Sequence, residues 1–192
     1  MPRGGGMRGA QGNRGQAMDW YITVFELIDM RSFSNLWFWI ALAVLWSTVS
    51  HWVLGVPWDL VIRARKQQGQ ALEDMETLVR INVDRTLYIA RESGLLLAAF
   101  GFFLLTVLVL MGFVYKREFA QAVFLLGVPV GIVWLLSVAT ATRIEAQALE
   151  GEALIKRLHK HRTIVQLIGV VSIFITAMWG MLQNLSASVL GI

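Results

Sequence analysis

Long apolar blocks alternate with charged segments along the chain. Residues 95–115 (LLLAAFGFFLLTVLVLMGFVY) and 119–142 (FAQAVFLLGVPVGIVWLLSVATAT) contain no charged side chain. Residues 36–58 are uncharged when His51 is neutral, and residues 163–184 contain only amides as strongly polar groups. A helix needs about 20 apolar residues to cross the hydrocarbon, where its backbone amides must bond internally. The pattern predicts an all-α polytopic membrane protein with a bundle of four transmembrane helices.

Two of the charged segments resemble each other. QALEDMETLVRINVDRT occupies residues 70–86 and QALEGEALIKRLHKHRT occupies residues 147–163, with seven of 17 positions identical at an offset of 77. Both are rich in good helix formers, and Gly69 and Gly151 are the natural turning points. We expect each to form a helical hairpin, the first projecting as a stalk. An ancient duplication and a shared compositional demand both explain the similarity.

The distribution of Lys and Arg predicts the orientation. The two long loops, residues 59–93 and 143–162, hold eleven basic residues, and the rest of the chain holds six. By the positive-inside rule, both loops face the cytoplasm and both termini lie outside. The two hairpin extensions are therefore expected to be cytoplasmic.

The N-terminal region is different in character. Residues 1–17 are rich in Gly, Arg and Gln and are expected to be disordered. They are either an RGG-like nucleic-acid arm or the product of an upstream start codon, with translation beginning at Met18. Residues 18–34 predict an amphipathic helix at the membrane interface, or alternatively a partner-binding helix, because apolar residues recur at i, i+4 and i+8: Trp20, Val24 and Ile28.

Composition narrows the possible functions. The chain is 56% hydrophobic and 16% charged, whereas a soluble domain has about 45–50% apolar and about 25% charged residues. The net charge of +4 comes from loops beside the membrane, so we expect no nucleic-acid partner. Absence of cysteine excludes disulfides and thiolate metal sites within the chain. No phosphate loop, nucleophile elbow, HExxH motif or intramembrane carboxylate pair is present, so neither a cofactor nor an enzyme is predicted.

Histidines are the candidate chemical groups. Ser47, Ser50 and His51 share one face near the end of the first span. An ionisable group there suggests a proton relay or a polar head-group site; the alternative is an interfacial histidine bonded to its neighbours. His159 and His161 point about 200° apart on a helix and do not share one metal ion. The surrounding block, KRLHKHR, predicts an anchor for anionic lipid head groups formed by Lys156, Arg157, Lys160 and Arg162.

Small residues mark two packing stripes. The third span contains Gly127 and Gly131 with Pro129 between them, which predicts a kink. The fourth span carries small residues at spacings of 3, 4 and 4: Gly169, Ser172, Thr176 and Gly180. Such stripes allow close helix approach, either within the bundle or in a homo-oligomer.

Two stretches carry a resemblance to a family. MDWYITVFELIDMRSFSNLWFWIALAVLWSTVSHWVLGVPWDLVIRAR, residues 18–66, and RINVDRTLYIAR, residues 80–91, resemble small bacterial inner-membrane proteins labelled as a component of the SufBCD complex. That complex assembles iron–sulfur clusters. The resemblance implies a protein of the bacterial inner membrane with no catalytic motif. Because cysteine is lacking, it implies docking rather than cluster ligation.

The function expected from these observations is a non-enzymatic membrane scaffold. Its cytoplasmic hairpins would dock a soluble partner, with the SufBCD complex as the candidate. The residues expected at the docking surface are charged: Glu73, Glu76, Arg80, Asp84 and Arg85. The alternative is a small proton-coupled transporter or channel that uses His51.

Overall fold

The computed structural model describes residues 36–190, with side chains described as far as residue 185. This part is almost entirely helical, as predicted. Three helical segments are long and apolar enough to cross a membrane: Gln70–Val114, Glu118–Gln147 and Gly151–Leu185. The tail predicted at residues 1–17 and the interfacial helix predicted at residues 18–34 lie outside the described residues.

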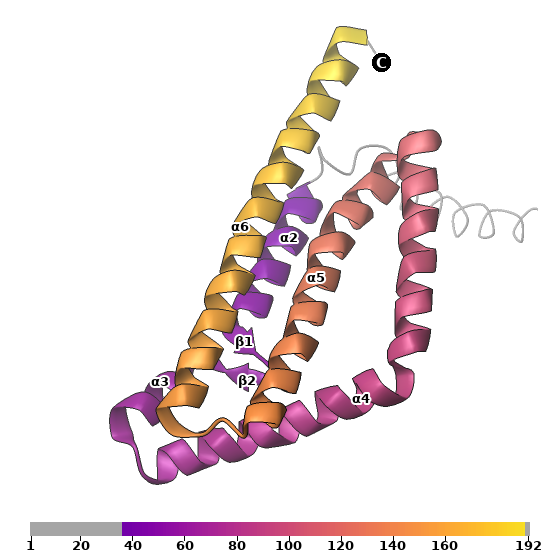
Figure 1. Cartoon of the computed structure of the whole chain (residues 1–192). Coiled ribbons are helices and arrows are strands. Elements are labelled where there is room, and N and C mark those ends of the chain that lie inside the picture. Colours follow the sequence, from indigo (N-terminus) through magenta and orange to yellow (C-terminus); the bar gives the residue numbers. More distant parts are fainter. Residues whose placement is uncertain (1–35, 191–192) are drawn as a thin grey trace, which may run out of the picture.

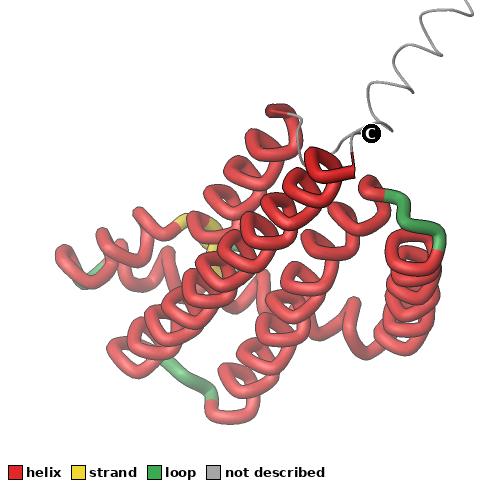
Figure 2. The backbone as a smooth tube through the Cα atoms, turned by 90° about the horizontal axis from the view of Figure 1, so that it is seen from above, coloured by secondary structure: helices red, strands yellow, loops and turns green. Residues whose placement is uncertain are grey.

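The elements follow one another with short connections. In chain order they are α2 (Leu36–His51), β1 (Trp52–Val53), β2 (Val56–Pro57), α3 (Trp58–Gln67), α4 (Gln70–Val109), the π-helical turn η2 (Leu110–Val114), α5 (Glu118–Gln147) and α6 (Gly151–Leu190). Helices α2 and α5 run alongside α6, while α4 first crosses beneath them and then turns upward (Figure 1). Seen from above, the second half of α4 stands apart from the other helices (Figure 2).

Helix α2 ends earlier than the span predicted over residues 36–58. Its described part has 16 residues and stops at His51, where a β-hairpin pairs Val53 with Val56. The two turn residues, Leu54 and Gly55, have φ values of 50° and 75°, as a two-residue hairpin loop requires. Pro57 then fixes an extended approach to α3. The prediction of four long spans is thus reduced to three among the described residues.

The first half of α4 also differs from its prediction as a projecting stalk. It lies across the ends of α5 and α6 (Figure 1). Four side chains spaced by four residues form its buried face, each at most 3% exposed: Met75, Val79, Val83 and Leu87. A projecting stalk would expose this apolar stripe to water. Packing against the bundle buries the stripe and is therefore more stable. The Ser93–Gly94 pair lies where the charged half meets the apolar half, and such pairs are common sites of sharp helix bends.

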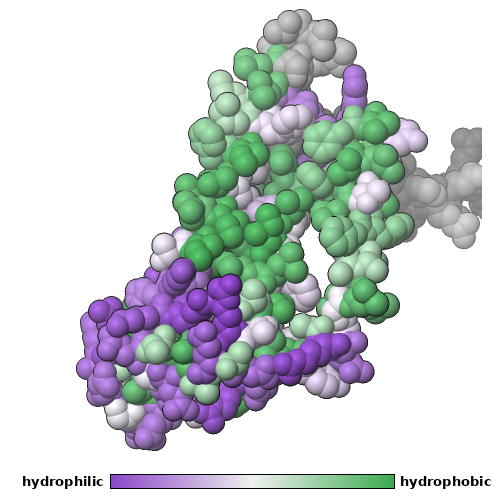
Figure 3. All heavy atoms as spheres, viewed as in Figure 1, coloured by the Kyte–Doolittle hydropathy of each residue, from purple (hydrophilic) through white to green (hydrophobic). Residues whose placement is uncertain are grey.

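Polar and apolar residues separate along the molecule. Hydrophilic residues gather over α3, the first half of α4 and the α5–α6 turn, while hydrophobic residues cover the helices above (Figure 3). We call this hydrophilic end, residues 58–93 and 143–162, the polar base. In the second half of α4, Leu95 is 89% exposed and Phe102 is 70% exposed. Such surfaces are consistent with a membrane protein whose polar base lies outside the hydrocarbon.

One amide joins three elements at the end opposite the base. Gln121 on α5 is buried, and its Nε2 donates to the Gly112 carbonyl in η2 at 2.8 Å. Its Oε1 accepts hydrogen bonds from Trp179 Nε1 at 3.0 Å and Gln183 Nε2 at 2.9 Å, both on α6. The sequence alone could have indicated this residue, because Gln121 is the single amide in the apolar block of residues 119–142.

Candidate functional site

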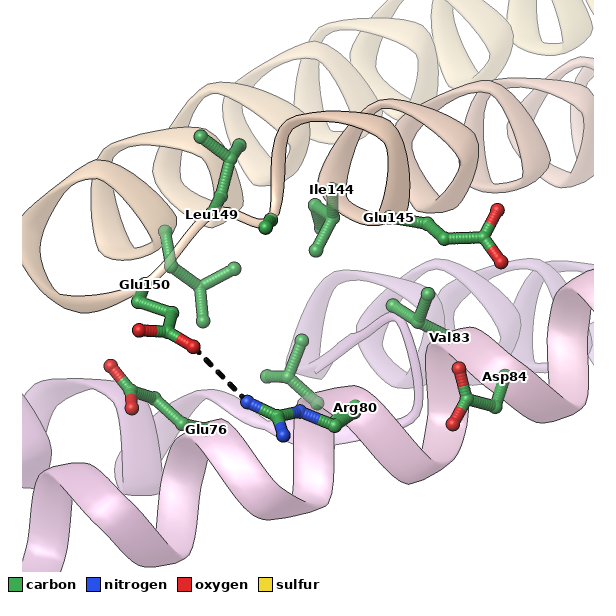
Figure 4. Close-up of a pocket in the computed structure, with 11 residues that line it drawn as sticks. Glu76, Arg80, Val83, Asp84, Ile144, Glu145, Leu149 and Glu150 are labelled. Atoms are coloured by element: carbon green, nitrogen blue, oxygen red, sulfur yellow. Dashed lines mark hydrogen bonds and ion pairs between the residues drawn. The ribbon is translucent and has the colours of Figure 1, made fainter.

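A cleft in the polar base lies between the first half of α4 and the turn that joins α5 to α6 (Figure 4). Its volume is about 350 Å³. The lining side chains combine apolar and acidic groups: Glu76, Val79, Arg80, Val83, Asp84, Ile144, Glu145, Ala148, Leu149, Glu150 and Leu154. The two segments that resemble each other in sequence therefore face each other across one cleft.

Two direct contacts connect these segments. Arg80 Nη2 lies 3.2 Å from Glu150 Oε1, and the backbone N–H of Gly151 donates to Glu76 Oε1 at 2.6 Å. Because both side chains of the ion pair are about two-thirds exposed, it contributes at most about 1 kcal/mol. Glu76 places its carboxylate at the N-terminus of α6, where the helix dipole favours negative charge. These contacts fix the α5–α6 turn on α4.

A further ion pair fixes α5 near the bend of α4. Arg91 donates from two guanidinium nitrogens to the two carboxylate oxygens of Glu145, at 2.5 and 3.3 Å. This two-pronged geometry orients both side chains more strictly than a single contact does.

The cleft is acidic above an apolar floor. Four of its lining residues are carboxylates and one is an arginine, so its own charge favours a cationic group. Within residues 36–190, no group of three or more His, Cys, Asp or Glu side chains is placed to hold a metal ion.

The outer face of α4 carries apolar groups that point away from the bundle. Ile81 is 58% exposed and Tyr88 is 69% exposed. Ile81 follows buried Val79 by two positions, or about 200° around a helix of 3.6 residues per turn. Tyr88 lies seven residues after Ile81 and therefore shares its face.

The five charged residues predicted at a docking surface divide into two groups. Glu76 and Arg80 bond within the chain, to the α5–α6 turn. Glu73, Asp84 and Arg85 are exposed on α4. Charge reversal at Glu76 or Arg80 would therefore disturb the base itself, which makes them poor probes of docking.

The polar residues predicted near the end of the first span, Ser47, Ser50 and His51, lie in the last part of α2. His51 is exposed, and its ring centroid lies 6.0 Å from that of Trp52 in an edge-on arrangement. Ser47 is exposed, whereas Ser50 is half-buried and its carbonyl accepts a hydrogen bond from Arg162 Nε at 3.3 Å.

The basic block of α6 is divided among different environments. Lys156 pairs with Glu152 at 2.9 Å, Lys160 is exposed and Arg157 is half-buried. Arg162 lies over the Trp58 ring, 4.4 Å from its centroid. Of the four side chains predicted to contact lipid head groups, Lys156 and Lys160 are therefore exposed, whereas Arg157 and Arg162 are half-buried.

His161 faces the interior, unlike the basic residues around it. It is 4% exposed, and its Nδ1 lies 3.1 Å from the hydroxyl of buried Thr140. Burial, aided by the positive charge of Arg157, lowers the pKa of His161 to about 4. Helical periodicity could have predicted this burial, because His161 shares the helix face of Leu158 and Val165, which are buried.

This pKa predicts acid-sensitive stability. Unfolded His161 takes up a proton near pH 6.5, whereas the folded form stays neutral down to about pH 4. Stability from this group is therefore complete above pH 6.5 and falls as the pH drops from 6.5 to 4, by on the order of 3 kcal/mol. Thermal unfolding in detergent at several pH values measures it. The loss should disappear in His161→Gln and persist in His159→Gln; equal curves for both variants would contradict the assignment.

The small residues predicted at packing stripes lie in different surroundings. Gly169, Ser172, Thr176 and Gly180 are all buried on α6. On α5, an added Cβ at Gly127 would lie 4.0 Å from Leu105, and one at Gly131 would have no neighbour within 4 Å. Helix α5 continues through Pro129 from Glu118 to Gln147.

Comparison with known proteins gives no relative. No family model, no curated protein and no solved structure matches the chain. The resemblance of residues 18–66 and 80–91 to the SufBCD-linked family therefore remains a hypothesis, and the functional argument depends on the geometry of the polar base.

Proposed function

We propose that the protein is a membrane-embedded scaffold whose polar base docks a soluble protein at the cytoplasmic side of a bacterial inner membrane. The observation that carries the proposal is the exposed pair Ile81 and Tyr88 on the outer face of α4. Both lie in the first half of α4, whose other exposed positions are mostly charged, so this face suits the polar base better than the hydrocarbon. Exposed apolar groups at i and i+7, surrounded by charge, are typical of a protein-binding helix face.

The surrounding charges support the same surface. Glu73, Asp84 and Arg85 flank the apolar pair and provide a polar rim that would exclude unsuitable partners. The buried stripe on the opposite side of α4 holds this face rigidly against α5 and α6. A rigid helix presents its side chains at little entropic cost on binding. The SufBCD complex is the first candidate partner, by the resemblance in residues 18–66 and 80–91.

Two tyrosines provide a matched test of docking. Tyr88 in the base is 69% exposed, and Tyr115 beside η2, at the other end of the second half of α4, is 68% exposed. We expect Tyr88→Ala combined with Ile81→Ser to weaken binding of purified SufBCD to proteoliposomes by at least about 30-fold, since a central aromatic anchor contributes 2 kcal/mol or more. Tyr115→Ala should bind like wild type.

Recovery from native membranes extends the test to other partners. A soluble protein that co-purifies in stoichiometric amount with wild type and Tyr115→Ala, but not with the base variant, would support the scaffold. Absence of any such partner, with all three proteins correctly inserted, would refute it. Equal loss in both tyrosine variants would place the interaction elsewhere.

A further inference from the structure

A groove in the polar base separates α3 from α6. It consists of two adjoining cavities of about 550 and 220 Å³, and Arg65 and His159 line both. One wall is helix α3, and the other is the first part of α6. This groove is distinct from the acidic cleft between α4 and the α5–α6 turn.

Cationic side chains from both helices converge on the groove. Arg65 and Lys66 come from α3, and Lys156 comes from α6; among the side chains that line it, the one carboxylate is Glu152. The bond to Lys156 and its positive charge, followed by the charge of Arg65, lower the pKa of Glu152. Cations of both helices therefore create a positive potential around Glu152, and such a potential favours binding of an anion in the groove.

The smaller cavity of the groove combines Arg65 and Lys66 with apolar and aromatic side chains. Trp58, Val61 and Ile62 form its wall, and Ile62 is 41% exposed. The Trp58 ring is held edge-on by His159, with centroids 4.5 Å apart, and is covered by Arg162. Immediately after Arg162, α6 enters its apolar block of residues 163–184. The groove thus combines cationic side chains along its length with an apolar and aromatic wall near the membrane-spanning part of α6.

We propose that the groove between α3 and α6 binds the head group of an anionic phospholipid, with its phosphate between Arg65, Lys66 and Lys156. Guanidinium and ammonium groups are the usual protein partners of phosphate oxygens. Trp58 and Ile62 would contact the glycerol region, where amphipathic tryptophan is favoured. The anionic leaflet of the membrane supplies such head groups at the depth where α6 leaves the hydrocarbon. This site is independent of protein docking on α4.

A charge-matched pair of variants tests the site. Arg65→Ala/Lys66→Ala removes two cations from the groove. Arg63→Ala/Arg143→Ala removes two exposed cations that do not line it. Native mass spectrometry of the full chain in neutral detergent would measure retention of added phosphatidylglycerol. We expect the groove variant to raise the apparent dissociation constant roughly 10- to 30-fold and the control variant less than about three-fold.

Additional ligands separate a lipid site from other anion sites. Phosphatidylcholine should bind wild type weakly, and soluble glycerol phosphate at millimolar concentration should not displace phosphatidylglycerol. Displacement by glycerol phosphate would show a site for free phosphate compounds and overturn the lipid assignment. Equal weakening in both double variants would show unspecific charge attraction and would also overturn it. Circular dichroism checks that each variant is folded, and exposed Lys66→Ala alone replaces the groove variant if that protein unfolds.

Discussion

Gly169→Leu is expected to cost about 3 kcal/mol of stability, because α6 packs directly against an aromatic ring of α2 at this position. Even a single added Cβ at Gly169 would lie 2.8 Å from Trp46 Cε3. Trp46 is 4% exposed, so its ring has little room to move away. Overpacking of this kind separates the helices or forces strained rotamers. Unfolding in mixed detergent and SDS micelles, followed by circular dichroism, measures the loss.

Gly131→Leu is the matched control for this substitution. Gly131 also lies within a long apolar helix, but its Cβ position has no neighbour within 4 Å. The change should be neutral or stabilising by up to about 1 kcal/mol, because glycine is a poor helix former. If both leucine variants unfold alike, the α2–α6 contact at Trp46 does not limit stability.

Gln121→Leu is expected to destabilise the protein by roughly 2–4 kcal/mol. The substitution keeps the side-chain volume similar but removes three hydrogen bonds that join η2, α5 and α6. Interhelical hydrogen bonds in membrane proteins contribute about 0.6 kcal/mol each on average and up to about 1.7 kcal/mol. The loss is larger here because the indole N–H of Trp179 and the carbonyl of Gly112 are left without Gln121 in apolar surroundings.

The control for Gln121 is an exposed amide on α6, away from the Gln121 cluster. Gln166 on α6 is exposed, and Gln166→Leu should change the unfolding midpoint little. Comparing the tryptophan fluorescence of the two variants gives a second readout, because Trp179 loses its hydrogen bond in Gln121→Leu alone. A wild-type midpoint for Gln121→Leu would show that the amide cluster forms without contributing to stability.

The sequence predicted the membrane-type helices well because their signal is local. Uncharged blocks such as residues 95–115 and 119–142 determine their own conformation in lipid, and Gly69 and Gly151 both lie at turns with positive φ. The end of α2 was missed for an instructive reason. WVLGVP is apolar enough to extend a span, yet its Gly and Pro favour a hairpin, and hairpin geometry overrode hydropathy.

The candidate site was harder to predict because its contacts join distant residues. Arg80 and Glu150 are 70 positions apart, so their pairing depends on how α4 crosses the bundle. Before that crossing was known, the charged residues of α4 seemed equally available to a partner. Burial of His161 and the role of Gln121 did leave signals, in helical periodicity and in a lone amide. The α3–α6 groove left a partial signal, the basic block that contains Lys156, but its pairing with α3 depends on segments that are apart in the chain.

The crossing of α4 beneath the bundle also sets an order of assembly during synthesis. The buried face of α4, from Met75 to Leu87, is covered partly by α3 and partly by Ile144, Leu154 and Leu158, which emerge from the ribosome more than fifty residues later. At about 5–20 residues per second, these later residues are synthesised roughly 3–15 s after the buried face of α4. During this interval, the amphipathic helix can bind its apolar face to the membrane surface. The base can therefore close only when α6 begins to emerge.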